Sequence, residues 1–224
     1  MRARPRRSIP GTAPDWSIGV HVYGVAAVGF GLIGVAWQDF ALVWQPVPPD
    51  VPVRAGLAWV VAIIFLIAGM AIQWRTTAPK AAAVLTTLYS LCVLLLHVPK
   101  VIVHPTELSP WAGVAEQLAL VAGGLLAYAL TGRLDPLRSA AFWRLARFFY
   151  VACLFSFGLV HFVFLDATAA LVPKWLPPYP EFWAYATGIA DWLAALAILS
   201  GVYALAAARL LRSPAIPTTP RCWD

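Results

Sequence analysis

The chain has 224 residues, of which 61% are hydrophobic and only 12% charged. A soluble domain carries roughly 25% charged residues because its surface must face water. This composition therefore excludes a soluble enzyme or binding module and indicates that lipid surrounds most of the protein. The net charge of +6 fits membrane topology better than nucleic acid, because the basic residues are spaced between apolar runs.

Six apolar stretches are each long enough to cross a bilayer, whose core of about 30 Å needs roughly 20 helical residues. All must be helices, because backbone groups have no water to bond in hydrocarbon. The sequence thus predicts an all-α membrane protein with about six transmembrane helices. The stretches cover residues 16–38, 55–73, 81–99, 111–131, 148–165 and 182–208.

The basic residues predict the orientation of these spans. With the N-terminus in the cytoplasm, the inside segments hold thirteen arginines and lysines and the outside segments three, namely Arg54, Lys100 and Lys174. Cytoplasmic loops of membrane proteins carry an excess of Lys and Arg. Both termini are therefore predicted to be cytoplasmic.

A shift of 127 residues aligns the first and fifth spans and predicts a partial, parallel internal repeat. With five more residues in the second loop, two further glycines align. The matched positions are Phe30-Gly31-Leu32 with Phe157-Gly158-Leu159, Asp39 with Asp166, Pro46 with Pro173, Gly56 with Gly188, and Gly69 with Gly201. Both copies would cross the membrane in the same direction, as in repeats related by an axis along the membrane normal.

The repeat and the spans together divide the chain into segments. We expect a four-helix membrane unit over 16–132 and a second, partial unit of two helices over 148–212. The second bundle is either truncated or completed by another subunit or a second copy. The remaining segments are a basic cytoplasmic N-terminus at 1–15, a cytoplasmic loop at 133–147 and a cytoplasmic tail at 213–224.

Three motifs in the second copy resemble the DoxX-like family of bacterial integral membrane proteins. Residues 158–162 read GLVHF, residues 171–177 read LVPKWLP and residues 186–191 read ATGIAD. The family pattern is an HF pair, a V-P-x-W-L-P loop, and a glycine followed shortly by an acid. Residues 94–100 and 111–116 are similar to the family's third and fourth helices, so the resemblance covers nearly the whole chain, split over the two copies.

The resemblance implies a four-helix bundle in the bacterial inner membrane. Some members of the family are subunits of thiosulfate:quinone oxidoreductases or of other redox-linked complexes. The first copy departs from the pattern, since Gly34 and Trp59 stand where the second copy has His161 and Asp191. Only the second copy carries those polar residues.

Ionisable residues gather toward the predicted outer face of the membrane. We take six of them as a candidate binding cluster, namely Asp39, His97, Glu116, His161, Asp166 and Asp191. His161 and Asp191 lie roughly 6 Å and 12 Å into their helices, and they form a candidate proton-handling pair. A histidine and a carboxylate can pass protons while a quinone gains or loses electrons. The alternative is an interhelical hydrogen bond that only fixes packing, worth about 0.6 kcal/mol in membranes.

The other polar residues carry weaker signals. Glu116 is expected in the first turn of its helix, where the dipole stabilises an acid. His97 and His104 are seven residues apart, but Pro99 and Pro105 interrupt that spacing. With Asp39 or Glu107 these histidines could bind a metal, yet no His-x3-His or Cys-x2-Cys pattern occurs, so no metal site is predicted.

No nucleotide, flavin or haem motif is present, so no cofactor is evident and a quinone remains possible. The sequence favours an accessory or quinone-associated subunit of a membrane redox system. One alternative is a carrier or binding protein for a small solute or lipid. A carrier should have polar residues near the membrane midplane, and here the midplane is almost wholly apolar, which counts against this alternative. Another is a purely structural subunit of a membrane complex. Whether the protein is an enzyme stays open.

Overall fold

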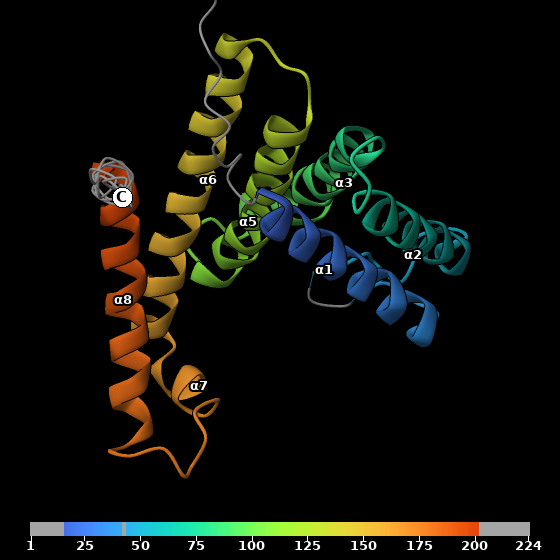
Figure 1. Cartoon of the computed structure of the whole chain (residues 1–224). Helices are drawn as coiled ribbons and strands as arrows, with labels where there is room; N and C mark the ends of the chain where they lie inside the picture. The colour runs from blue at the N-terminus through green and yellow to red at the C-terminus, as the bar shows by residue number, and fades with distance from the viewer. Residues whose placement is uncertain (1–15, 42–43, 202–224) are drawn as a thin grey trace, which may run out of the picture. The chain divides into compact units, whose positions relative to one another are not determined.

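The computed structural model of the chain describes residues 16–41 and 44–201, and within these residues every regular element is helical (Figure 1). The elements are α1 (Trp16–Trp37), α2 (Arg54–Ala71), α3 (Ala78–Cys92), the π-helical turn η1 (Val93–His97), α4 (Val98–Val103), α5 (Leu108–Thr131), α6 (Pro136–Val163), α7 (Leu165–Ala169) and α8 (Pro180–Ser200).

Within residues 16–41 and 44–201, six helical stretches are long and apolar enough to cross a membrane. They are α1, α2, the continuous run from α3 to α4, α5, α6 and α8. Many of their large apolar side chains are exposed, as suits helices that face lipid rather than water. The predicted all-α membrane fold with about six spans is confirmed. The predicted N-terminal segment 1–15 and tail 213–224 lie outside the described residues.

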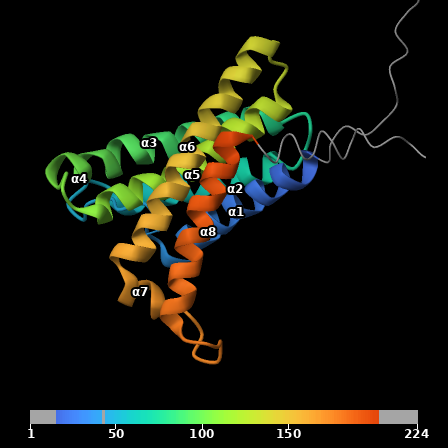
Figure 2. The same ribbon diagram turned by 90° about the vertical axis from the view of Figure 1, so that its left-hand side faces the viewer.

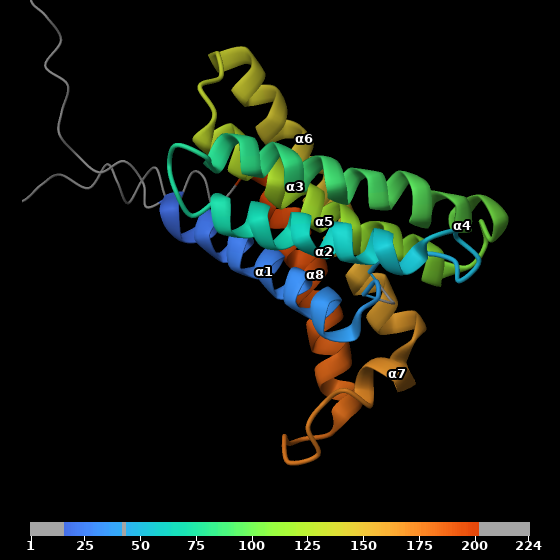
Figure 3. The same ribbon diagram turned by 90° about the vertical axis from the view of Figure 1, so that its right-hand side faces the viewer.

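The chain divides into two compact units, residues 1–146 and residues 147–224, and the boundary falls inside α6. In the first unit α1 packs along α2 and α3 packs along α5, with α2 beside α3 and α1 beside α5. Figures 2 and 3 show these four helices side by side, with α4 at the far end of α3.

Small residues let the α1 and α2 backbones approach closely. A Cβ on Gly24 would lie 2.8 Å from the carbonyl oxygen of Gly69, and a Cβ on Gly69 would lie 2.7 Å from that of Gly24. Such small-residue contacts are the usual way in which helices pack inside a membrane. Next to this crossing, the rings of Phe30, Phe65 and Tyr89 form the aromatic core, with centroids 5.2–6.3 Å apart.

The third span contains a π-helical turn immediately before a proline. Pro99 lacks an N–H group and its ring clashes with the carbonyl four residues earlier, which normally breaks a helix. The wider turn at η1 accommodates the proline, so the helix continues to Val103. The span predicted to end at Pro99 is therefore longer.

Helices α3, α5, α6 and α8 each begin at least two residues earlier than predicted, and each has a proline in its first turn, namely Pro79, Pro110, Pro136 and Pro180. Pro110 stands near the start of α5, which begins at Leu108 rather than Trp111. Glu116 therefore lies in the third turn, and the prediction that it lies in the first turn is wrong. Pro136 opens α6, so most of the predicted loop 133–147 is helical, because the segment is rich in alanine, leucine and arginine.

The second unit contains the later part of α6, the short helix α7 and α8. Val151, Leu154 and Ala195 form a small apolar core between α6 and α8. Gly158 lies against Gly188, whose carbonyl oxygen would be 2.8 Å from a Cβ on Gly158.

The contacts of the two helix pairs differ in the register that the repeat predicts. Gly31 lies against Ala62 and Leu66. Its counterpart Gly158 lies against Gly188, the counterpart of Gly56 rather than of Ala62. The internal repeat is thus not confirmed and stays a prediction.

Candidate functional site

The six predicted site residues divide between the two units. Unit 1 holds Asp39, His97 and Glu116, and unit 2 holds His161, Asp166 and Asp191. Within unit 2, His161 and Asp191 lie together. Within unit 1, His97 and Glu116 line one pocket, whereas Asp39 takes part in a separate ion pair.

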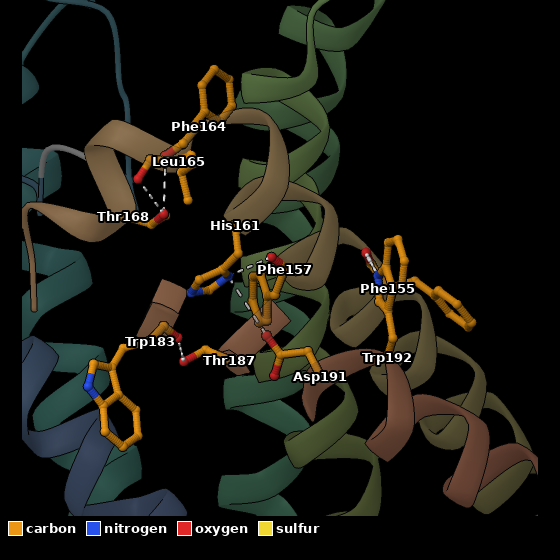
Figure 4. Close-up of polar contacts among 10 residues, drawn as sticks. All are labelled: Phe155, Phe157, His161, Phe164, Leu165, Thr168, Trp183, Thr187, Asp191 and Trp192. Carbon is orange, nitrogen blue, oxygen red and sulfur yellow. Dashed lines mark hydrogen bonds and ion pairs between the residues drawn. The ribbon is translucent and has the colours of Figure 1, made fainter. Parts of the chain in front are cut away.

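His161 on α6 and Asp191 on α8 face each other across the helix crossing (Figure 4). Nδ1 of His161 lies 3.9 Å from a carboxylate oxygen of Asp191. Each side chain keeps about a quarter of its surface exposed, 24% for His161 and 23% for Asp191. The pair is thus close enough for an ion pair when the imidazole is protonated, and it is accessible to a small molecule.

The crossing glycines explain why these two side chains meet. Gly158 and Gly188 bring the α6 and α8 backbones close together, and a Cβ on Gly188 would lie only 3.0 Å from the Cβ of His161. His161 and Asp191 each stand three residues further along their helices. Since residues three apart share a helix face, both side chains point into the same gap.

The hydrogen bond of His161 assigns its tautomer. Nδ1 lies 2.8 Å from the carbonyl oxygen of Phe157, which can only accept, so Nδ1 carries a hydrogen. In the neutral ring Nε2 is then an acceptor, and Figure 4 shows it on the opposite side of the ring from Phe157 and Asp191. Among the described residues no protein group bonds to Nε2.

Aromatic side chains lie at the same helix crossing, Phe162 against Gly188 and Trp192 against Gly158. The ring of Phe162 lies 4.8 Å from that of Trp192 and 5.9 Å from that of Tyr185. Trp192 donates its indole N–H to the carbonyl oxygen of Phe155 at 3.1 Å. The carboxylate and imidazole therefore form a polar spot on a largely apolar helix face.

Asp166 does not join the pair. It lies in the first turn of α7, where an acid is favoured by the helix dipole. Among the described residues its side chain makes no hydrogen bond or ion pair. In α7 it is Thr168 that bonds to the backbone, through its hydroxyl and the carbonyl oxygens of Phe164 and Leu165.

In unit 1, the carbonyl oxygen of Trp44 accepts two side-chain hydrogen bonds. Nε2 of His97 lies 3.2 Å from it and Nε2 of Gln117 lies 2.9 Å from it. Both side chains are buried, at 4% and 1% exposure. They tie the loop after α1 to the third and fourth spans.

Asp39 pairs with Arg54 rather than with a histidine. It follows the end of α1, and Arg54 opens α2, so the ion pair closes the loop that joins the two helices. The hydrogen bond from Arg54 holds the pKa of Asp39 below its ordinary value, with a smaller effect from the backbone N–H of Phe40. The guanidinium of Arg54 also lies 5.6 Å from the ring centre of Phe40.

The two histidines near Pro99 do not share a helix face. His97 is buried, whereas the exposed His104 lies 2.9 Å from Glu107. Among the described residues no group of three metal-binding side chains occurs.

Sequence reasoning missed Gln117 and the pairing of Arg54. An uncharged amide inside an apolar run was the available signal for Gln117, because such a group needs a hydrogen-bond partner in hydrocarbon.

Comparison of the chain with protein-family models, curated proteins and solved structures gives no match. The resemblance to the DoxX-like family therefore rests on the quoted residues alone.

Proposed function

We propose that this chain is a DoxX-like protein of the bacterial inner membrane that serves as an accessory, quinone-associated subunit of a membrane redox system. In this proposal both termini are cytoplasmic, and the His161–Asp191 pair lies toward the periplasmic face. The observation that carries the proposal is the partly buried pair itself, 3.9 Å apart at a helix crossing that also holds aromatic side chains.

The residues present fit a quinone headgroup. The free acceptor Nε2 of His161 suits the hydroxyl of a reduced quinone, and the aromatic rings of Phe162 and Trp192 suit its apolar ring. A bound quinone would supply two-electron chemistry. His161 would take up a proton at Nε2 while keeping the one at Nδ1, and Asp191 would stabilise the resulting positive charge. Electron transfer itself would fall to a partner subunit, which is why we propose an accessory role.

The test is quinone binding to the protein in lipid nanodiscs. A short-chain ubiquinone analogue should quench tryptophan fluorescence saturably, because Trp192 directly follows Asp191 in α8. His161→Leu and Asp191→Asn should each weaken binding about tenfold or more, which corresponds to about 1.4 kcal/mol. His104→Leu removes an exposed histidine and serves as the matched control.

Equal affinity in all four proteins would contradict the proposal, as would the absence of saturable quenching in the wild type. The accessory role has its own test. Gentle purification should recover another membrane subunit together with the chain, and recovery of the chain alone would contradict that part.

A further inference from the structure

A pocket of about 290 Å³ opens in unit 1 between α5 and the segment formed by η1 and α4. Binding pockets for small molecules span roughly 300–1,000 Å³, so this pocket suits a small ligand. Its polar side chains are those of His97, Lys100, Ser109 and Glu116. Two other pockets of the same unit are lined mainly by apolar side chains.

Glu116 stands in this pocket, and within the described part of the chain it has no protein partner. It lies eight residues after Leu108, roughly 12 Å along α5 at 1.5 Å per residue, and it is partly buried. Among the described residues no hydrogen bond or ion pair reaches its carboxyl group. A carboxylate at such a depth is costly unless it meets a counter-charge. A positively charged group from outside the chain would supply one.

His97 adds a second acceptor beside the carboxylate. Its Nε2 is engaged with the carbonyl oxygen of Trp44 and therefore carries the hydrogen, which leaves Nδ1 as an acceptor in the neutral ring. Nδ1 faces Gly113 on the pocket wall, where a Cβ would lie only 2.9 Å away. Because Gly113 has no side chain, this nitrogen meets only the α5 backbone there, and the ring keeps 4% exposure.

Lys100 brings the opposite charge to the same pocket. It is exposed, and it lies one turn after His97. The pocket therefore combines a carboxylate and a neutral nitrogen acceptor with an ammonium group.

We propose that this pocket binds a small zwitterion, whose ammonium group faces Glu116 and Nδ1 of His97 and whose anionic group faces Lys100. The inference does not depend on quinone binding, which concerns His161 and Asp191 in the other unit.

The first test measures the thermal unfolding midpoint of the full chain in nanodiscs, since a ligand of the folded state raises that midpoint. The probes are glycine and 4-aminobutyrate as zwitterions, ethylamine as a cation and propionate as an anion. At least one zwitterion should raise the midpoint saturably, and by more than either single-charge probe at equal concentration. If neither zwitterion raises the midpoint in this way, the proposal is overturned. That is the result expected if Glu116 is simply protonated and binds no ligand.

Variants then assign the site. Glu116→Gln keeps the side-chain shape and should reduce the affinity for the zwitterion at least tenfold, while its midpoint without ligand stays equal or rises. Lys100→Gln should also weaken binding of the zwitterion. In this variant the midpoint shift with ethylamine should be larger, relative to that with the zwitterion, than in the wild type. Glu107→Gln is the matched control, because it removes an exposed acid. An undiminished response in Glu116→Gln, an equal loss in Glu107→Gln, or a lower midpoint of Glu116→Gln without ligand would each overturn the proposal.

Discussion

His161 and Asp191 each lie three residues beyond the glycine at which their helices cross, and Nδ1 of the imidazole is 3.9 Å from the carboxylate. The spacing of the two polar side chains is therefore set by backbone contact rather than by the pair's own attraction. A change at the crossing should alter the pair without touching either residue.

Gly158→Ala should destabilise the protein by about 1–3 kcal/mol, as overpacking of a tight contact does. The added Cβ would lie 2.3 Å from the indole of Trp192 and 2.8 Å from the carbonyl oxygen of Gly188. Unfolding titrations in mixed micelles would measure this. Gly29→Ala is the control, since a Cβ there meets nothing within 4 Å. Equal stability of the two variants would show that the helices do not cross at Gly158.

The Asp39–Arg54 pair should make stability depend on pH. The pKa of Asp39 is lower in the folded protein than its ordinary value of 3.8. Its contribution is therefore fully present above that value and is lost as the pH falls below it toward the folded pKa. Asp39→Asn should flatten this acid limb of the unfolding midpoint, measured from pH 6 down to pH 3. An unchanged acid limb would contradict the pairing.

Removing both donors to the carbonyl oxygen of Trp44 should lower the free energy of unfolding by more than the sum of the two single removals. Gln117→Leu or His97→Leu alone leaves the carbonyl one donor, at a cost of about 0.6 kcal/mol. The double variant leaves a buried acceptor unsatisfied, at about 1–3 kcal/mol. A double-mutant cycle on unfolding free energies measures the difference. Strict additivity would mean that the two side chains act independently.

The distribution of arginine and lysine makes a prediction about orientation. Reporters fused after residues 45, 77, 107, 136, 175 and 213, the last of which is outside the described residues, should read outside and inside alternately. The signal after residue 213 should be cytoplasmic. A periplasmic signal there would break the six-span topology.

The helices of this fold could be predicted because an apolar run of about 20 residues has no other structure open to it in lipid. Their ends could not. Pro99 reads as an interruption but is accommodated by a π-turn, and Pro110 and Pro136 stand in the first turns of helices that begin before the apolar runs do. A proline in the first turn of a helix removes a donor that has no partner anyway.

The site was predictable where depth alone decides which residues meet. His161 and Asp191 lie on antiparallel neighbours joined by a short connection, so similar depth implied contact, and the structure brings them together. Depth does not tell which face of a helix a residue occupies. For that reason Asp39 was grouped with His97, although it pairs with Arg54 across its own loop. Gln117 carries no charge, and its only signal was an amide inside an apolar run.

Because of the π-turn at Val93–His97, the number of residues in the third span is more important for the positions of His97 and Lys100 than the identity of most of its side chains. Leu94 and Leu95 within it are exposed, so other apolar residues should replace them freely. One residue fewer in this turn would restore an ordinary α-helical ladder and rotate all that follows by about 100°. His97 would then turn away from Trp44, and Lys100 would leave the pocket wall. We therefore expect this segment to accept many substitutions but no deletion.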